Sequence, residues 1–543
     1  MAGCGFKRGW GAGLVAALLG TAAPSAPPAT PLPHIEGGHG RYALVVDGRP
    51  YLMLSAQANN SSNYPYVLPK VWPVLDRLNA NTLEIPVAWE QIEPTEGHFD
   101  FSWVDTLTTQ ARDHGKRLVL LWFGTWKNTG PGYAPEWVQL DRKRFPHMVD
   151  AKGKTMYALS PYPRTTLDAD KRAFTALMTH LRDIDPQNTV IMVQVENETG
   201  TYGSARDHSP AANRMFAGPV PAALASHLHK QAGTWEQMFG RDAEVAFHAW
   251  AIASYVDQVA AAGKAVKPLP MYVNAALPNH PDTWQDPNTY ASGGPDPAVL
   301  DVWKAAAPHI DVLGPDIYNP DFHDYMGFLD AYQRPDNPLF VPETGNAKPY
   351  ARYAFAVLGR GAIGFSPFGM DLSGYSNFPL GAPKVDDDTI ATFAFPFRLF
   401  APLVHLWPTW ALQGKTWGVS EPTDPALKHT QTVALGPWKA EVTFGQPQFG
   451  KPAPTGNEFP TGGAAIAELS PGEYIVMGAH ARVTFSATDP NKTDAMVQHV
   501  EQGYFDKDDH WVSERVWNGD QTDYGLNFTS IPQMLRVTLK VAH

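Results

Sequence analysis

The sequence predicts an α/β protein, a (β/α)8 barrel followed by a C-terminal antiparallel β-sandwich, on three observations. The chain has 543 residues, too many for one ordinary domain, and 44% hydrophobic against 18% charged residues indicate a large globular core. Eight short apolar runs alternate with eight helix-like stretches between residues 51 and 410. After about Gln413 the pattern changes to short strands separated by Gly, Pro, Asn and Asp.

The predicted barrel strands are continuous apolar runs, which is typical of parallel strands buried on both faces. They are residues 51–56, 82–89, 117–122, 190–195, 271–275, 311–317, 339–343 and 362–368. The helix-like stretches are residues 70–78, 103–114, 171–181, 244–262, 297–306, 322–332, 347–358 and 389–410. Eight such units close into a barrel. A doubly wound open sheet is the alternative, but the first strand lacks the Gly-rich phosphate turn that usually accompanies it.

The ends of the chain predict different structures. Lys7 and Arg8 precede a short apolar stretch, which indicates an export signal over residues 1–26 and a periplasmic or secreted protein. Residues 27–40 are then a Pro-rich linker, residues 41–412 the barrel and residues 413–543 the sandwich. The sandwich strands are expected at residues 433–435, 438–444, 464–469, 473–477, 481–486 and 535–541.

Composition narrows the class of function. The net charge of −12 is spread without acidic blocks, which argues against nucleic acid or an anionic membrane as the main partner. The 17 Trp and 20 Tyr residues suit a protein that stacks sugar rings on aromatic planes, although a large barrel core explains them equally well. The sequence has no HExxH motif, no His/Cys cluster and no Gly-x-Ser-x-Gly elbow, so we expect neither a metal, a cofactor nor a catalytic serine.

Two predicted strands end in carboxylates, at the end of the barrel where barrel enzymes keep their catalytic groups. The fourth strand leads into Glu196, Asn197 and Glu198, and the seventh leads into Glu343. Glycoside hydrolysis needs two carboxyl groups facing one anomeric carbon, about 5–5.5 Å apart for retention and further apart for inversion. A single Glu would be a surface cap, but a pair at these positions favours catalysis. Strand alternation points Glu196 and Glu198 the same way, so the pattern alone does not separate them.

Three motifs resemble the glycoside hydrolase family 35 β-galactosidases, members of the large clan of (β/α)8 retaining glycosidases. The motifs are residues 194–200, residues 89–94 with 99–101, and residues 314–318. The resemblance implies that Glu198, which follows an Asn, is the acid/base and that Glu343 is the nucleophile. It also implies that Asn197 bonds the sugar 2-hydroxyl and that Tyr318 bonds the nucleophile. Bacterial members with one sandwich after the barrel are similar, and some act on galactosyl side chains of xyloglucan.

Other strand ends supply candidates for binding the substrate. Glu90 ends the second strand, Trp126 and Asn128 follow the third, and Asn274 lies in the fifth. Around Glu90 and Trp126 the sequence departs from the Tyr and Glu with which the best-known family members grip galactose. Turn polarity explains Asn274 equally well. Further strand-end candidates are Gln57, Asn59 and Phe368, the last as an apolar floor.

The sequence therefore predicts an exo-acting, retaining β-galactosidase. It would remove terminal β-D-galactosyl residues from plant-derived oligosaccharides through a covalent glycosyl-enzyme. The alternatives are another clan member, such as a β-glucosidase, arabinosidase or endo-glycanase, and, less favoured, a non-catalytic carbohydrate-binding barrel. The expected partner is a carbohydrate, without nucleic acid, membrane insertion or cofactor.

Overall fold

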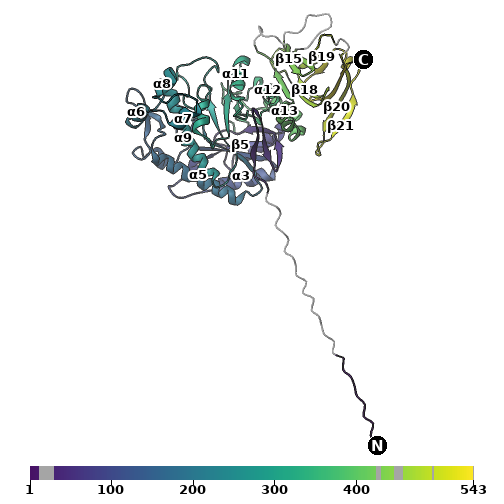
Figure 1. Cartoon of the computed structure of the whole chain (residues 1–543), viewed down its shortest axis with the longest axis horizontal. Coiled ribbons are helices and arrows are strands. Elements are labelled where there is room, and N and C mark those ends of the chain that lie inside the picture. The colour runs from purple at the N-terminus through teal and green to yellow at the C-terminus, as the bar shows by residue number, and fades with distance from the viewer. Residues whose placement is uncertain (11–29, 424–429, 446–455, 492–494, 542–543) are drawn as a thin grey trace.

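Eight parallel strands close into a barrel, and an antiparallel sandwich follows it, as the sequence predicts (Figure 1). The structure is a computed structural model that describes residues 1–10, 30–423, 430–445, 456–491 and 495–541. The barrel strands are β4 (Met53–Gln57), β5 (Thr82–Ala88), β6 (Arg117–Lys127), β9 (Val190–Asn197), β10 (Met271–Ala276), β11 (Val312–Ile317), β12 (Val341–Thr344) and β13 (Gly364–Pro367). Each pairs in parallel with its neighbours, and β13 returns to β4.

Helices follow the barrel strands and form its outer layer. They are α1 (Trp72–Leu78), α2 (Trp89–Ile92), α3 (Ser102–Asp113), α4 (Glu136–Gln139), α5 (Arg164–Ile184), α9 (Ala243–Lys264), α10 (Leu300–Ala306), α11 (Phe322–Tyr332), α12 (Tyr353–Gly359), α13 (Asp387–Phe400) and α14 (Leu406–Leu412). Two insertions hold elements that the sequence analysis does not predict. They are the hairpin β7 (His147–Val149) and β8 (Thr155–Leu159), and the helices α6 (Pro210–Phe216), α7 (Ala222–His227) and α8 (Trp235–Phe239).

Several helix ends are fixed by local hydrogen bonds. The Asp321 side chain accepts from the backbone N–H groups of His323 and Asp324, which caps α11. The Asp386 side chain caps α13 in the same way. Helix α1 ends at Leu78 and is followed by Asn79, whose φ of 59° is the left-handed conformation common at helix C-termini. These caps set where the chain turns back toward the next strand.

A small antiparallel sheet closes the N-terminal end of the barrel. It consists of β1 (His34–Gly38), β2 (Arg41–Val46) and β3 (Arg49–Tyr51). Leu44, Val46 and Tyr51 pack with Met53 and Tyr272 of the barrel strands. Part of the predicted Pro-rich linker, residues 27–40, is therefore strand β1, which pairs with β2. Most of the predicted export signal, residues 11–26, lies outside the described residues.

The C-terminal domain is a sandwich of two antiparallel sheets. One sheet has the order β14-β17-β18-β23-β20-β21 and the other β15-β16-β19-β22. Their strands are β14 (Thr416–Ser420), β15 (Thr430–Leu435), β16 (Trp438–Phe444), β17 (Gly463–Ser470), β18 (Glu473–Ala479), β19 (Ala481–Ala487), β20 (Ala495–Phe505), β21 (Trp511–Val516), β22 (Leu526–Phe528) and β23 (Met534–Val541). Buried side chains such as Val442, Phe444 and Val476 fill the space between the sheets.

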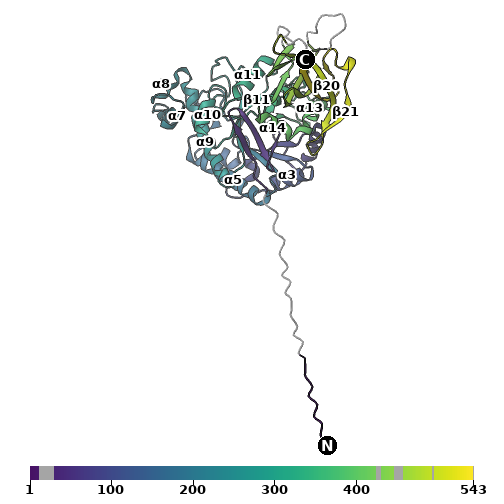
Figure 2. The ribbon, with the colours of Figure 1, turned by 45° about the vertical axis from the view of Figure 1, so that its right-hand side comes forward.

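The sandwich is packed directly against the last helices of the barrel (Figure 2). A Cβ atom added at Gly418 of β14 would lie 1.9 Å from the backbone oxygen of Phe355 in α12. The Ser420 hydroxyl donates to the Arg352 carbonyl over 2.7 Å, and the Arg352 Nε–H donates to the Glu421 carbonyl over 2.8 Å. This close contact makes barrel and sandwich one packed unit.

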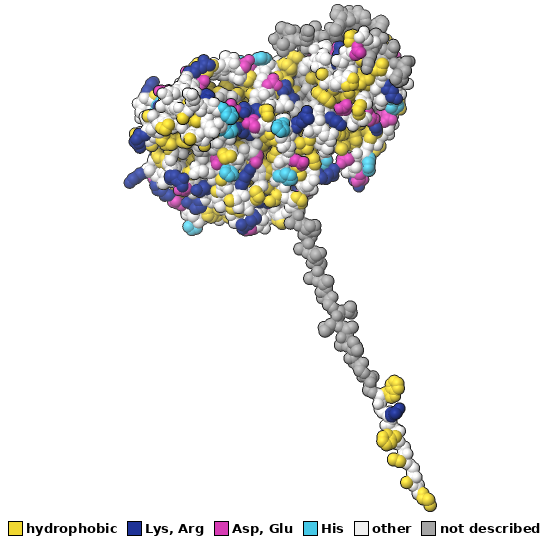
Figure 3. Space-filling model, in the orientation of Figure 1, with side chains coloured by type: hydrophobic (Ala, Val, Ile, Leu, Met, Phe, Trp, Pro, Cys, Tyr) yellow, Lys and Arg dark blue, Asp and Glu magenta, His cyan; other side chains and the backbone are white. Residues whose placement is uncertain are grey.

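The surface carries interspersed charges of both signs on the face that Figure 3 presents. Among the described residues, no single helix has both the length and the apolar composition to cross a membrane. One pair, Asp387–Leu403 with Leu406–Leu412, meets those criteria only when its two parts, bent by 78°, are taken together. Phe393, Phe397 and Trp407 of this pair are buried in the core.

Candidate active site

A cavity of about 520 Å³ lies at the C-terminal ends of the barrel strands. Glu198 after β9, Tyr318 after β11 and Glu343 in β12 line it. The lining also includes Lys127, Asn128, Tyr202, Asp316, Phe368, Tyr375 and Leu380. All lining residues fall between Asn60 and Leu380, so the barrel builds this cavity. A second cavity of about 670 Å³, where the barrel meets the sandwich, has no carboxylate in its lining.

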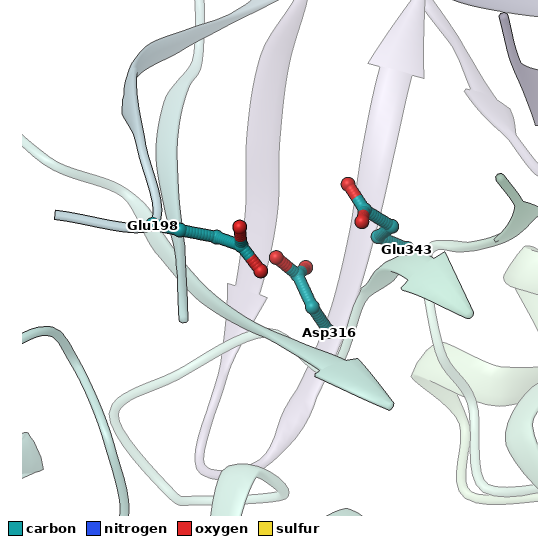
Figure 4. Close-up of side chains that lie close together, drawn as sticks. All are labelled: Glu198, Asp316 and Glu343. Atoms are coloured by element: carbon teal, nitrogen blue, oxygen red, sulfur yellow. The ribbon is translucent and has the colours of Figure 1, made fainter. Parts of the chain in front are cut away.

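Three carboxyl groups meet in the first cavity, those of Glu198, Asp316 and Glu343 (Figure 4). One oxygen atom of each lies within 4.8 Å of one oxygen atom of the other two. Asp316 is the direct neighbour of Glu343 in the register of β11 and β12, whereas Glu198 approaches from the end of β9. The fourth and seventh barrel strands thus bring the two predicted catalytic carboxyls together.

Glu343 is buried and has a hydrogen bond to each of its oxygens. The Tyr318 hydroxyl donates to Oε1, and Gln57 Nε2 donates to Oε2 over 2.9 Å. Burial raises the pKa of Glu343 to about 7, and the nearby Glu198 acts in the same direction. Lys127 and the two hydrogen bonds oppose this rise. The contact from Tyr318 is the one that the family resemblance implies.

Glu198 is fixed through its backbone. Its N–H donates to Asn274 Oδ1 over 3.0 Å, and Asn274 Nδ2 donates to Asp316 Oδ2 over 2.6 Å. Both ends of the Asn274 amide are therefore used inside the protein, and the side chain is fully buried. The prediction that Asn274 binds substrate is corrected, because this residue positions Glu198 and Asp316. Lys127 Nζ lies 4.0 Å from Glu198 Oε2 and offers a positive charge beside the carboxyls.

The structure separates Glu198 from its neighbour Glu196. Both residues have positive φ angles, 64° at Glu196 and 48° at Glu198, so the chain leaves the regular strand conformation here. Glu196 Oε2 accepts a hydrogen bond of 2.7 Å from the backbone N–H of Trp126, and Asp170 of α5 lies beside it. The expectation that both glutamates point the same way is wrong, because strand alternation does not apply to left-handed backbone. Only Glu198 of the two lines the cavity.

Four of the predicted binding residues do not line the cavity, namely Asn274, Trp126, Glu90 and Asn197. Trp126 is 2% exposed, its indole N–H donates to the Leu159 carbonyl over 3.1 Å, and its ring packs on Tyr255. It is buried because β6 continues to Lys127, five residues beyond the predicted strand end. Glu90 lies in the short helix α2, outside the cavity lining, where burial raises the pKa of its carboxyl group.

The two remaining candidates differ in position. Asn128 is exposed, lines the cavity and accepts a hydrogen bond from the Lys127 ammonium group. Asn197 is fully buried, and within the described part of the chain neither its amide oxygen nor its amide nitrogen has a hydrogen-bond partner. A buried amide without a partner is costly, and this one directly precedes Glu198 but lies outside the cavity lining.

Sequence reasoning missed three features of the cavity. Asp316 belongs to the quoted 314–318 motif, but no role was assigned to it. Lys127 lies between the candidates Trp126 and Asn128 but was not predicted to line the site, and its distance from Glu198 depends on the extension of β6. The loop after β13 contributes Tyr375 and Leu380, and its only sequence signal is its place after the eighth barrel strand.

The fold and the site together define a class, a (β/α)8 barrel with the paired carboxyl groups of a glycoside hydrolase. Residues 73–262 match the family model described as β-galactosidase, that of glycoside hydrolase family 42. Residues 393–529 match a family described as a domain of unknown function, DUF5597. The first match lies within the clan of barrel glycosidases that the motifs indicate, but it does not support family 35 specifically.

Individual relatives are similar over part of their length. A β-galactosidase of Xanthomonas manihotis is 30% identical over 177 residues, which are 31% of this chain and 26% of that protein. The crystal structure of a β-galactosidase from the psychrophilic Marinomonas ef1 has a TM-score of 0.47 at 13% identity, over 65% of this chain and 60% of that one. A β-galactosidase structure from Bacillus circulans sp. alkalophilus has a TM-score of 0.47 at 12% identity, over 70% and 62%. The chain spans less than two thirds of each of these three proteins.

Proposed function

We propose that this protein is an exo-acting, retaining β-galactosidase in which Glu343 is the nucleophile and Glu198 the acid/base. The observation that supports this most directly is the approach of the Glu198 and Glu343 carboxyl oxygens to within 4.8 Å at the ends of the fourth and seventh barrel strands. Double displacement requires carboxyl groups about 5–5.5 Å apart, and this close approach favours it over inversion, which requires about 6.5–9.5 Å to admit a water molecule. Galactose as the sugar is supported by the names of the matching family and relative.

The reaction would proceed in two displacements. In the first, ionised Glu343 attacks the anomeric carbon, the glycosidic C–O bond breaks, and Glu198 gives its proton to the leaving oxygen. In the second, Glu198 takes a proton from water, the water oxygen attacks the anomeric carbon, and the ester bond to Glu343 breaks. Two inversions give net retention. Asn197 would bond the 2-hydroxyl, and Tyr318 would keep Glu343 oriented for attack.

The proposed substrates are oligosaccharides with a terminal β-galactose, including galactosyl side chains of xyloglucan. Tyr375 and Leu380 support an extended substrate, since they line the cavity while remaining 60% and 51% exposed. Apolar surface at the rim of a sugar site can pack against the next ring. We also propose export to the periplasm or medium, on the basis of the basic and apolar N-terminal sequence. The motifs favour family 35 and the family model favours family 42, and the proposed activity is the same for both.

A second candidate is a clan glycosidase with another sugar specificity. It is favoured by one observation, that Glu90 and Trp126 lie outside the cavity lining, which leaves the sugar 4-hydroxyl without a predicted contact from either residue. A panel of p-nitrophenyl β-glycosides separates the candidates. Preference for glucoside or arabinoside over galactoside would replace the galactose assignment and leave the mechanism intact.

The central experiment is hydrolysis of p-nitrophenyl β-galactoside by the wild type and by Glu343→Ala, with and without azide. We expect a loss of about 10⁴-fold or more in the variant, because no nucleophile remains. Azide should restore activity and give the α-galactosyl azide, since it attacks in a single inversion. The matched control is Glu196→Gln, which changes a buried glutamate two residues from Glu198 that lies outside the cavity lining. Full activity of Glu343→Ala would rule out the assignment.

A further inference from the structure

A third carboxyl group, that of Asp316, lies between the two proposed catalytic groups (Figure 4). The two-displacement mechanism uses only Glu198 and Glu343, so it leaves Asp316 without a role. Asp316 is 2% exposed and sits beside Glu343 in the register of the barrel strands. A carboxyl buried this deeply next to two others is costly unless protons are shared among them.

The hydrogen bonds around Asp316 indicate where its proton lies. Oδ2 accepts from Asn274 Nδ2 over 2.6 Å. Oδ1 is buried and has no N–H or O–H donor among the described residues, and one oxygen of Asp316 lies within 4.8 Å of one oxygen of Glu198. Two ionised carboxylates this close repel each other, and they can hydrogen-bond only if one of them holds a proton. Asn274 fixes both partners, because its Oδ1 accepts from the Glu198 backbone.

The charged and titratable groups that face this pair come from every adjoining element. They are Lys127 of β6, Tyr202 after β9, Tyr272 of β10, Tyr318 after β11, Tyr332 of α11 and Glu343 of β12. Lys127 is the cation of this set and favours ionised carboxyls. Glu343 and burial act in the opposite direction and raise the pKa of Asp316. The surroundings therefore favour a pair that retains one proton.

We propose that Asp316 and Glu198 share one proton, and that this sharing keeps the acid/base protonated while Glu343 is ionised. Asp316 is then a positioning residue for the proposed glycosidase reaction, and the inference rests on that proposed function. In a coupled carboxyl pair the first proton is lost easily and the second is retained to higher pH. This matters here because Glu343, whose pKa is raised to about 7, is ionised only near or above neutral pH.

The protons balance over the reaction. Before glycosylation the pair holds one proton and Glu343 is ionised. The shared proton moves to the glycosidic oxygen as the C–O bond breaks, which leaves both members of the pair ionised and Glu343 neutral as an ester. The negative charge lost from Glu343 thus offsets the charge gained by the pair. Water returns a proton to the pair in the second displacement, as the ester bond breaks.

The test compares kcat/KM over pH for the wild type, Asp316→Asn and Asp316→Ser, with two substrates. Lactose has a saccharide leaving group that must be protonated, whereas 2,4-dinitrophenyl β-galactoside has a leaving group that departs without a proton. We expect the alkaline limb for lactose to move down by about one pH unit in both variants, a loss of about tenfold on the alkaline side. The dinitrophenyl substrate should lose little. The Asn side chain has the shape of Asp and can still accept the hydrogen bond from Asn274, and the smaller Ser side chain fits within the same space. Either variant is therefore a sufficient test if it folds.

A control variant and three possible results decide whether Asp316 shares a proton with Glu198. Glu84→Gln removes another buried barrel carboxyl, one that accepts from Ser55 and Tyr272 and is not bonded to Glu198, and should leave the alkaline limb in place. An unshifted limb in both Asp316 variants would overturn the inference. Equal losses on both substrates at all pH values would also overturn it and indicate that Asp316 binds the sugar. A wild type that hydrolyses no glycoside would instead remove the proposed function, and the inference with it.

Discussion

The hydroxyl group of Tyr318 stabilises the ionised form of Glu343, because it donates a hydrogen bond to Oε1. In Tyr318→Phe that donor is lost, and we expect the pKa of Glu343 to rise above its value of about 7. The proposed mechanism needs ionised Glu343, so the acidic limb of kcat/KM should move to higher pH by about one unit. The measurement is the pH profile with 2,4-dinitrophenyl β-galactoside.

A tyrosine of the same region provides the control for Tyr318→Phe. The Tyr325 hydroxyl donates to Thr344 Oγ1 over 3.2 Å, one residue from Glu343 but without contact to its carboxyl group. Tyr325→Phe should therefore leave the acidic limb unchanged. A limb that stays fixed in Tyr318→Phe, or moves to lower pH, would contradict the role given to this hydrogen bond.

At the residue scale the sequence predicted what strand ends and motifs determine, and missed what depends on local backbone. Glu198, Glu343 and Tyr318 follow from their places after barrel strands and from the family resemblance. Strand alternation gave no way to separate Glu196 from Glu198, since it does not anticipate the left-handed angles at both residues. Trp126 was misplaced because the length of β6 beyond its apolar run is set by pairing with β9.

At the scale of elements, the contact between α12 and β14 should be sensitive to a single methyl group. Gly418→Ala would place a Cβ atom 1.9 Å from the Phe355 carbonyl oxygen, so strand or helix must shift. We expect a loss of about 1–3 kcal/mol in the free energy of unfolding, the usual cost of overpacking. Thermal and denaturant unfolding measure it.

The matched control is Gly38→Ala in β1, where an added Cβ meets no atom within 4 Å. This variant should unfold like the wild type. If Gly418→Ala were equally stable, the sandwich and barrel would have to yield at their contact without cost, which would contradict their close packing.

Strands and helices whose residues form a clear apolar pattern were predictable, and those with mixed polar and apolar residues were not. All eight barrel strands coincide with continuous apolar runs because both of their faces are covered. Strand β21 (Trp511–Val516) was missed, since it lies at a sheet edge and four of its six residues are exposed. The helices α6 to α8 are short, and tertiary contacts rather than a long periodic pattern determine them.

At the scale of the whole molecule, the buried carboxyl group of Glu343 should reduce stability as pH rises. Burial raises the pKa of Glu343 from 4.5 to about 7. Below about pH 4.5 the group is protonated whether the chain is folded or unfolded, and it costs nothing. As pH rises toward 7 only the unfolded chain releases the proton, so folding loses up to about 3 kcal/mol, and above 7 the loss is constant.

Glu343→Gln removes this loss. We therefore expect the variant to exceed the wild type in melting temperature at pH 8 and to match it at pH 4.5. Glu84, whose pKa burial raises to about 8, contributes with the same sign in both proteins and cancels in the comparison. A difference that is independent of pH would show that packing of the side chain, and not its charge, is responsible.

The order of the two domains along the chain was predictable from the sequence pattern, but the close packing of the sandwich against the barrel was not. The predicted change at residue 413 falls between α14 and β14. The match to DUF5597 starts at residue 393, within α13. That family therefore includes the last helices of the barrel, in line with the contact that joins them to the sandwich. Side-chain complementarity across α12 and β14 has no signature in a single sequence.

The sheet that closes the N-terminal end of the barrel has a practical consequence. Because β1 to β3 lie on the side opposite the cavity, His34 at the start of β1 lies at the base of the molecule. An affinity tag or a covalent tether placed there would attach the protein to a bead or an electrode with its cavity facing the solution. Immobilised protein should then keep the KM that it has when free, even for a branched polysaccharide.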